Sequence, residues 1–173
     1  MIILIHKISN GIFKVEKLFA IILGVSMLFS LTSGVLYRYI LKAPLVWSDE
    51  VAIFSLVWLS FIGGSMSLKM QNSASITIVM DLVKGKLRQV LLIVGFVILL
   101  SFVGYILYLS IGWLSSPNIQ VQKSTSMGMP MIYAYLSIPV SFFFMFIHLL
   151  DLLIQTFKNG GKFEKVGEEV HVS

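Results

Sequence analysis

Residues 90–114 read VLLIVGFVILLSFVGYILYLSIGWL, a long run without Asp, Glu, Lys or Arg. Three further runs of this kind cover residues 18–37, 51–68 and 131–150, and the last of them ends at Asp151. A helix needs about 20 apolar residues to cross the ~30 Å hydrocarbon layer of a bilayer. Because a backbone in lipid must satisfy its own polar groups, each run is predicted to be a spanning helix, the fourth extending to about residue 153.

The composition argues against a soluble protein. The chain is 57% hydrophobic and 12% charged, whereas soluble domains carry roughly 25% charged residues. Its basic residues are spread over termini and loops with no nucleic-acid-binding motif, so no nucleic acid partner is expected. The chain has no cysteine, which excludes disulfides and thiolate metal sites. We therefore predict one all-α integral membrane domain over residues 1–173, with four transmembrane helices, no cofactor and no bound metal.

The basic residues predict the orientation of the chain. Ten of the thirteen Lys and Arg residues lie before the first span, between the second and third spans, or after the fourth span. These ten are Lys7, Lys14, Lys17, Lys69, Lys84, Lys86, Arg88, Lys158, Lys162 and Lys165. The other two loops hold only Arg38, Lys42 and Lys123. Since positive residues accumulate on the cytoplasmic side, both termini are predicted to be cytoplasmic.

Several segments outside the spans have their own predicted structure. Within residues 75–88 the apolar residues and the polar residues each recur at helical spacing, on opposite faces. This pattern predicts an amphipathic helix lying in the cytoplasmic interface. The alternative is an extension of a neighbouring span. Residues 1–13 are rich in Ile and Leu but contain several polar residues, and they are also expected at this interface. Pro130 is expected at the first position of the fourth helix, and Pro139 is expected to kink that helix or open one of its backbone bonds.

Small residues recur every four positions in three spans. Such rows let helices approach closely in lipid, so they predict helix–helix contacts within the chain or with a partner. The rows are Ser26, Ser30 and Gly34; Ser60 and Gly64; Gly63 and Ser67; and Ser137 and Ser141.

The spans offer little chemistry. Transporters usually place ionisable groups inside the bilayer, and His148 is the one ionisable residue within the four runs. His148 and Asp151 share a helix face, where they can form a proton-linked pair, lie at the headgroup level, or lie against a neighbouring helix. No catalytic or phosphate-binding motif is present. We therefore expect no enzyme. The alternatives are a small homo-oligomeric channel or transporter, and a membrane enzyme using His148 and Asp151.

The densest group of polar and aromatic residues is the first loop, residues 37–50, which reads YRYILKAPLVWSDE. Tyr and Trp favour the membrane interface. Ser48 is predicted to cap the second span, and Asp49 and Glu50 favour its positive N-terminus. Arg38 is predicted to pair with Asp49 or Glu50. Without such a pair the loop would be only a helix cap and an interfacial anchor.

These residues resemble a known family. Arg38-Tyr39, Pro44 and Trp47-Ser48-Asp49-Glu50 are similar to the pattern of the small membrane subunit, or Q subunit, of tripartite ATP-independent periplasmic (TRAP) transporters. Trp58, Gly63 and Asp81 match further positions, but the His that often precedes the Asp does not occur here. The candidate structural and partner-contact residues are Arg38, Trp47, Asp49, Glu50, Trp58, Gly63 and Asp81.

The resemblance implies a role in transport. It implies a non-catalytic scaffold subunit of a sodium-coupled uptake system for carboxylate-bearing solutes of the dicarboxylate or sialic acid class. The implied partners are a large membrane subunit of about twelve spans, forming a heterodimer with this chain, and a periplasmic substrate-binding protein that docks on the outer face. The implied location is the bacterial inner membrane, with the lipid bilayer around the complex.

Overall fold

Four long helices dominate the structure, a computed structural model that describes residues 2–70 and 86–159. They are α1 (Ile2–Tyr39), α2 (Val46–Lys69), α4 (Lys86–Leu114) and α7 (Ser137–Asn159). Two short helices, α5 (Pro117–Gln120) and α6 (Ile132–Tyr135), lie between α4 and α7. Four helical segments, the last formed by α6 and α7 together, are long and apolar enough to cross a membrane. The predicted all-α fold with four spans is confirmed.

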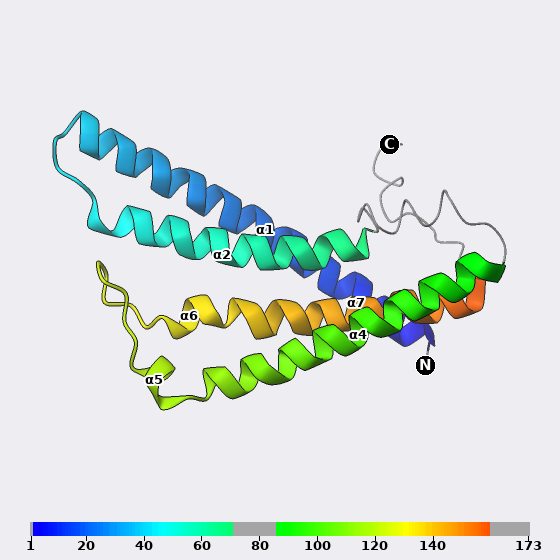
Figure 1. Cartoon of the computed structure of the whole chain (residues 1–173). Coiled ribbons are helices and arrows are strands. Elements are labelled where there is room, and N and C mark those ends of the chain that lie inside the picture. The colour runs from blue at the N-terminus through cyan, green and yellow to red at the C-terminus, as the bar shows by residue number, and fades with distance from the viewer. Residues whose placement is uncertain (1, 71–85, 160–173) are drawn as a thin grey trace, which may run out of the picture.

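Helix α7 is the central helix of the bundle. It packs against α1, α2 and α4, while α1 also packs along α2. Figure 1 shows α1 crossing behind α2 and reaching α7 near the N-terminus. We call the end with the loops 40–45 and 115–131 the hairpin end. The opposite end, where α1 and α4 begin and α2 and α7 finish, is called the terminal end.

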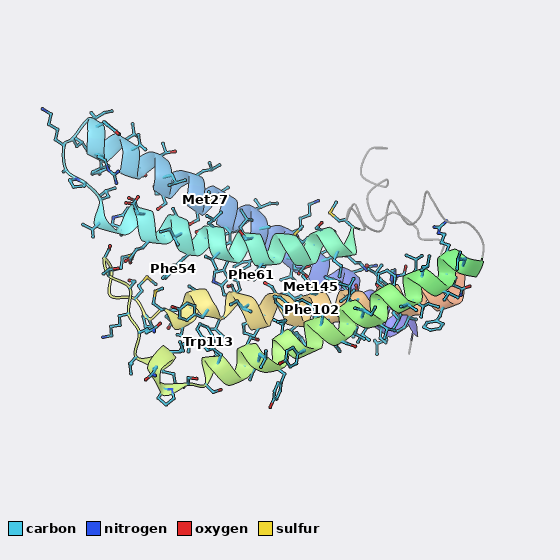
Figure 2. All side chains as sticks on the ribbon, viewed as in Figure 1. Met27, Phe54, Phe61, Phe102, Trp113 and Met145 are labelled. Atoms are coloured by element: carbon cyan, nitrogen blue, oxygen red, sulfur yellow. The ribbon has the colours of Figure 1, made fainter. Side chains whose placement is uncertain are left out.

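Apolar side chains hold α4 against α7. The buried cluster consists of Leu92, Phe96, Val103, Leu149 and Leu152, each at most 5% exposed. At Gly104 a Cβ atom would lie 3.6 Å from the ring of Phe146, an ordinary van der Waals distance, so this face of α4 lies against α7. Side chains fill the space between neighbouring helices and also project outward from α1 and α4 (Figure 2). In lipid such contacts stabilise mainly through close packing.

The small-residue row of α1 contacts the start of α2. Ser30 is fully buried, and its Oγ donates a hydrogen bond of 2.8 Å to the carbonyl oxygen of Ser48. One turn further on, a Cβ atom at Gly34 would lie 2.6 Å from Ser48 Oγ. Any side chain at position 34 would therefore force α1 or Ser48 to shift. In the second span Ser60 and Gly64 are exposed, whereas Gly63 and Ser67 are half-buried.

Helix α1 is longer than the sequence predicted. Residues 2–13, expected at the interface and outside the first span, continue α1 as its first three turns. Its 38 residues extend about 57 Å at 1.5 Å per residue, whereas the hydrocarbon layer is about 30 Å thick. Part of α1 must therefore lie outside the hydrocarbon or cross it at a tilt. Of the predicted amphipathic helix, residues 75–85 lie outside the described residues and residues 86–88 belong to α4.

The two prolines near the fourth span lie differently from each other. The prediction that Pro130 opens the helix was wrong, because α6 begins at Ile132 and Pro130 instead forms an isolated β-bridge with Lys123. Pro139 lies within α7, and the helix is interrupted at Leu136, between α6 and α7. A proline has no N–H to donate four residues back, so Pro139 cannot bond the carbonyl of Tyr135. The interruption thus falls beside the backbone bond that the proline removes.

Candidate functional site

The hairpin end contains the predicted ion pair. Arg38 Nη2 lies 3.2 Å from Asp49 Oδ2, so Arg38 pairs with Asp49, one of the two predicted partners. The two side chains are 54% and 63% exposed. Exposed pairs of this kind contribute about 0–1 kcal/mol in water. The pair therefore positions the ends of α1 and α2 only weakly.

Glu50 has a different role from the one predicted. Its carboxylate accepts hydrogen bonds from Ser124 Oγ at 2.6 Å and from the backbone amides of Ser126 and Met127 at 2.6 and 2.9 Å. The loop bends back at Gly128, whose φ is +67°. Because three donors converge on one carboxylate, Glu50 ties the first hairpin to the loop before α6. A residue at the start of α2 thereby links the two halves of the bundle.

The prediction that Ser48 caps α2 was wrong. Helix α2 begins at Val46, and its N-cap residue Leu45 makes no side-chain capping bond. Ser48 lies inside the first turn and donates from Oγ to the Leu45 carbonyl at 2.9 Å. Its side chain is buried against α1 because Gly34 makes room for it. Close helix packing, not capping, explains a serine at this position.

The remaining predicted residues are scattered. Trp47 is 36% exposed near the start of α2, and Trp58 Nε1 donates to the Tyr133 carbonyl at 2.9 Å. A Cβ atom at Gly63 would meet nothing within 4 Å, which leaves that face of α2 open. Asp81 lies outside the described residues. The structure thus gathers Arg38, Asp49 and Glu50 at the hairpin end and places Trp58 and Gly63 further along α2.

The terminal end contains a buried ion pair that the sequence did not predict. Lys69 Nζ lies 2.6 Å from Asp151 Oδ2, and the two side chains are 1% and 3% exposed. His6 Nδ1 lies 3.2 Å from Asp151, and its own side chain is 45% exposed. Removing one partner of such a buried pair typically costs about 3–5 kcal/mol, since a charge is left without compensation. This pair therefore fixes the end of α2 against α7.

A chain of hydrogen bonds continues from Lys69 into α1. Lys69 Nζ donates to Ser9 Oγ at 2.7 Å, and Ser9 Oγ lies 2.8 Å from His148 Nδ1. His148 Nε2 lies 3.0 Å from Glu16 Oε2. Ser9, Glu16 and His148 are at most 1% exposed. We call this group of residues, His6, Ser9, Glu16, Lys69, His148 and Asp151, the terminal network.

The sequence contained a signal for the terminal network. His6, Ser9 and Glu16 recur at spacings of three and seven, which places them on one face of a helix. His148 and Asp151 do the same on α7. Lys69 was counted only among the basic residues that predict orientation, and Glu16 precedes the predicted first span, residues 18–37. His148 and Asp151 are joined through Ser9 and Lys69.

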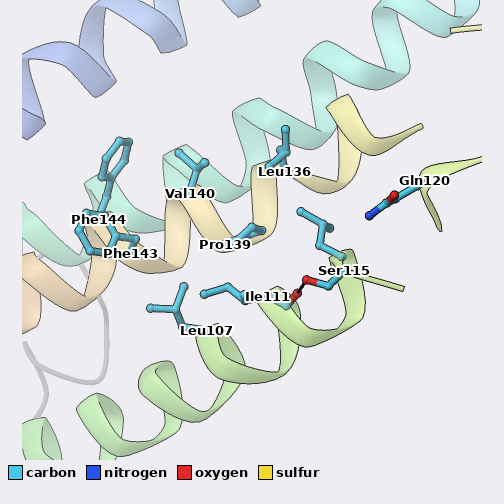
Figure 3. A pocket seen from close by; sticks show the side chains of 10 residues that line it. Leu107, Ile111, Ser115, Gln120, Leu136, Pro139, Val140, Phe143 and Phe144 are labelled. Atoms are coloured by element: carbon cyan, nitrogen blue, oxygen red, sulfur yellow. Dashed lines mark hydrogen bonds between the residues drawn. The ribbon is translucent and has the colours of Figure 1, made fainter. Parts of the chain in front are cut away.

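The described residues show no metal-binding chemistry. Among them, no group of three His, Cys, Asp or Glu side chains is placed to hold an ion. A groove of about 540 Å³ between α4 and α7 is lined mostly by apolar side chains, with Ser115 and Gln120 toward the hairpin end (Figure 3). Its other lining residues include Leu107, Ile111, Leu136, Pro139 and Phe143. A second groove on α4, of about 560 Å³, is also largely apolar.

The chain is similar to components of bacterial transporters. The family described as "Tripartite ATP-independent periplasmic transporters, DctQ component" matches residues 27–159. The chain is 24% identical over 155 residues to the "Sialic acid TRAP transporter small permease protein SiaQ" of Vibrio cholerae, covering 90% of this chain and 87% of that protein. It is 28% identical over 142 residues to the "Isethionate TRAP transporter permease protein DctMQ" of Oleidesulfovibrio alaskensis. That match covers 79% of this chain but spans only 22% of the relative.

Proposed function

Because the chain belongs to the DctQ component family of tripartite ATP-independent periplasmic transporters, we propose that it is the non-catalytic scaffold subunit of a sodium-coupled uptake system. The family makes it a subunit of a transporter and not an enzyme. The finer role, packing against a large transport subunit without binding the solute, is our proposal. It rests on how the described residues use their polar groups.

The observation that carries the scaffold role is the placement of the charged side chains. A solute or ion pathway needs polar or ionisable groups that line a water-accessible cavity. Here the buried ion pair Lys69–Asp151 connects helices, and Glu50 binds a loop. The two grooves described above are largely apolar. This use of Lys69, Asp151 and Glu50 to hold helices and a loop together supports the proposed scaffold role.

The two flanking helices offer surfaces for a membrane partner. Helix α1 exposes Leu18, Ile22, Val25 and Phe29 at helical spacing, and each of these side chains is more than half exposed. Helix α4 exposes a similar stripe, consisting of Val94, Ile98, Phe102, Tyr105 and Tyr108. Inside a membrane such stripes contact lipid tails or another membrane protein. We propose that the large subunit covers one stripe in a heterodimer and that lipid covers the rest.

The solute is proposed only by class. The names of the two relatives mention isethionate, which is a sulfonate, and sialic acid, which is a carboxylate. Both are organic acid anions. We propose an organic acid anion as the solute, with a carboxylate-bearing one as the first candidate, and a periplasmic binding protein that delivers it. Selection among anions would belong to the large subunit and the binding protein.

Reconstitution tests this function. The chain is co-expressed with a large subunit and added to proteoliposomes with the binding protein, a radiolabelled organic acid and an inward sodium gradient. We expect a stable one-to-one complex in detergent, and uptake only when all three proteins and sodium are present. Proteoliposomes with this chain alone are the matched control. Sodium-driven uptake by the chain alone would contradict the scaffold role and favour a self-contained transporter.

A further inference from the structure

The first turns of α1 have two unlike faces. Ser9 and Glu16 are at most 1% exposed, and they contact Lys69 and His148 inside the bundle. The residues on the outward side are apolar or basic, and all of them are exposed. We call this side the outer face of α1, and it consists of Leu4, Lys7, Ile8, Gly11, Lys14 and Val15. The helix thus directs a carboxylate and a hydroxyl inward and large apolar side chains outward, unlike a surface helix of a soluble protein.

The outer face is one continuous stripe along the helix. Its residues follow one another at spacings of one, three and four, which places them on the same side of an α-helix. Leu4, Ile8 and Val15 are 61%, 45% and 62% exposed. The two lysines, at positions 7 and 14, lie about 10 Å apart along the axis at 1.5 Å per residue. The stripe therefore combines an apolar surface with two ammonium groups.

The two lysines of the outer face have no counter-charge in the part of the chain that the structure describes. The ion pairs there involve other side chains, and neither Lys7 nor Lys14 takes part in a hydrogen bond with a described residue. Glu16, the nearest acidic residue in the sequence, lies on the opposite face and contacts His148. Both ammonium groups are therefore available to an anion outside the described residues.

The length of α1 indicates where the outer face lies in the membrane. Residues 18–37 are uncharged and long enough to cross the hydrocarbon layer by themselves, so the outer face precedes the span. The headgroup layer is only about 5–8 Å deep, whereas residues 4–17 extend about 21 Å. A segment along the membrane normal would carry Leu4 and Ile8 into water. Covering them requires this segment to lean into the headgroup layer, and Figure 1 shows that α1 is inclined to α2 and crosses it.

We propose that the outer face of α1 is a binding surface for anionic phospholipid. Acyl chains cover its apolar side chains, and the ammonium groups of Lys7 and Lys14 pair with negatively charged headgroups. An anionic phospholipid satisfies both parts of the surface, because it joins apolar chains to an anion in one molecule. Lysine side chains reach the headgroup level while their stems stay on apolar surface. The buried contacts of Ser9 and Glu16 hold the outer face in this orientation.

A protein partner fits the outer face less well than lipid does. A large subunit or a second copy of this chain would have to place acidic side chains at membrane level to meet two lysines, and ionised groups there are costly. Anionic lipid supplies the negative charge in the headgroup layer without that cost. The outer face also precedes residue 27, where the family match begins. The proposal therefore does not depend on the scaffold role.

Spin-labelled lipids test this surface on the full chain in nanodiscs of phosphatidylcholine. The chain has no cysteine, and a Cβ atom at Gly11 would meet nothing within 4 Å. Gly11→Cys therefore carries a fluorophore on the outer face, between the two lysines. Quenching is compared between nanodiscs that contain spin-labelled phosphatidylglycerol and nanodiscs that contain the same fraction of spin-labelled phosphatidylcholine. We expect both lipids to quench, and phosphatidylglycerol to quench more strongly.

The preference for phosphatidylglycerol should depend on the lysines. Lys7→Gln with Lys14→Gln, added to Gly11→Cys, should lower the association of phosphatidylglycerol relative to phosphatidylcholine by up to about fivefold for each lysine. Lys42→Gln with Lys123→Gln is the matched control, since it removes the same charge from the hairpin end and should keep the preference. Raising the salt concentration from about 0.1 M to about 1 M should also reduce the preference, because salt screens exposed charges.

Several results would overturn the proposal. Equal quenching by the two lipids would show a surface without preference for anions, and weak quenching by both would show that lipid does not reach it. A preference that survives the loss of Lys7 and Lys14 would place the anion elsewhere. Quenching that disappears when a large subunit is co-assembled would show that a protein covers the outer face. The salt series leaves both lysines in place, so a preference unaffected by salt overturns the proposal even if the double variant fails to fold.

Discussion

At the scale of single residues, the chain uses charge in two environments with different consequences. Arg38 and Asp49 form an exposed pair at the hairpin end, where water screens their attraction. Lys69 and Asp151 also form an ion pair between a basic side chain and a carboxylate, but both side chains are buried. Burial makes the second pair costly to break, because either charge alone would stay without water or partner.

We predict that Lys69→Ala destabilises the chain by about 3–5 kcal/mol, since Asp151 would remain buried and unpaired. The double variant Lys69→Met with Asp151→Leu should recover most of this loss, because an apolar pair replaces both charges. Denaturant unfolding in detergent, followed by tryptophan fluorescence, measures both. Lys17→Ala, on the exposed face of α1, serves as the control, with an expected change within about 0.5 kcal/mol. A Lys69→Ala variant as stable as the control would contradict the buried pair.

A second prediction separates Asp49 from Glu50. In a double-mutant cycle Arg38 should couple to Asp49, by no more than about 1 kcal/mol, and should not couple to Glu50. Glu50→Gln should speed hydrogen exchange at the amides of Ser126 and Met127, because a neutral amide accepts more weakly than a carboxylate. Asp49→Asn is the matched change and should leave both amides protected. Coupling between Arg38 and Glu50 would restore the pairing that the sequence left open.

At the scale of the helices, close approach decides which small residues matter. Gly34 faces Ser48 across the α1–α2 contact, whereas a Cβ atom at Gly24 on the same helix would meet nothing within 4 Å. Both residues are glycines of α1, so neither the residue type nor the helix shows which of them is in a close contact. Only the position of α2 makes a side chain at Gly34 clash while one at Gly24 would not.

We predict that Gly34→Ala destabilises the α1–α2 contact by about 1–3 kcal/mol, the usual cost of overpacking, since the new Cβ would lie 2.6 Å from Ser48 Oγ. Adding Ser48→Ala should return part of that loss by removing the clashing oxygen. Gly24→Ala is the matched control and should change stability little. Thermal unfolding in detergent compares the three variants. If Gly34→Ala and Gly24→Ala behave alike, the close approach is wrong.

At the scale of the whole molecule, the terminal network changes how the charges indicate orientation. Lys69 is buried in an ion pair, so it no longer counts as a free positive charge at the membrane surface. The remaining basic residues still favour the terminal end by nine to three. The positive-inside rule therefore continues to predict that the terminal end is cytoplasmic.

This orientation can be measured, because the chain has no native cysteine. Single substitutions Lys17→Cys, Lys84→Cys and Lys162→Cys should be blocked from a membrane-impermeant thiol reagent in intact spheroplasts. Lys42→Cys and Lys123→Cys should react. Permeabilised cells are the control and should label all five positions. Labelling of position 84 from the periplasm would reverse the predicted orientation.

The sequence by itself determined the spans and the class of protein. The absence of Asp, Glu, Lys and Arg from residues 90–114 is a local property, and the cost of moving a helix into lipid adds up residue by residue along it. The ion pair between Arg38 and Asp49 could also be predicted as one of two pairings, because these residues are only 11 positions apart across one loop. Residues 37–50, together with Trp58, Gly63, Asp81 and the four predicted spans, indicated the transporter family.

Only the tertiary structure decided the terminal network and the role of Glu50. Glu16 and His148 are 132 positions apart, Lys69 and Asp151 are 82 apart, and Glu50 meets a loop 74 to 77 positions away. These contacts depend on α7 lying between α2 and α4 while α1 crosses to reach it. Helical spacing shows which residues of one helix share a face. It does not show which other helix packs against that face, or through which residues. That choice is made by packing among all the helices at once.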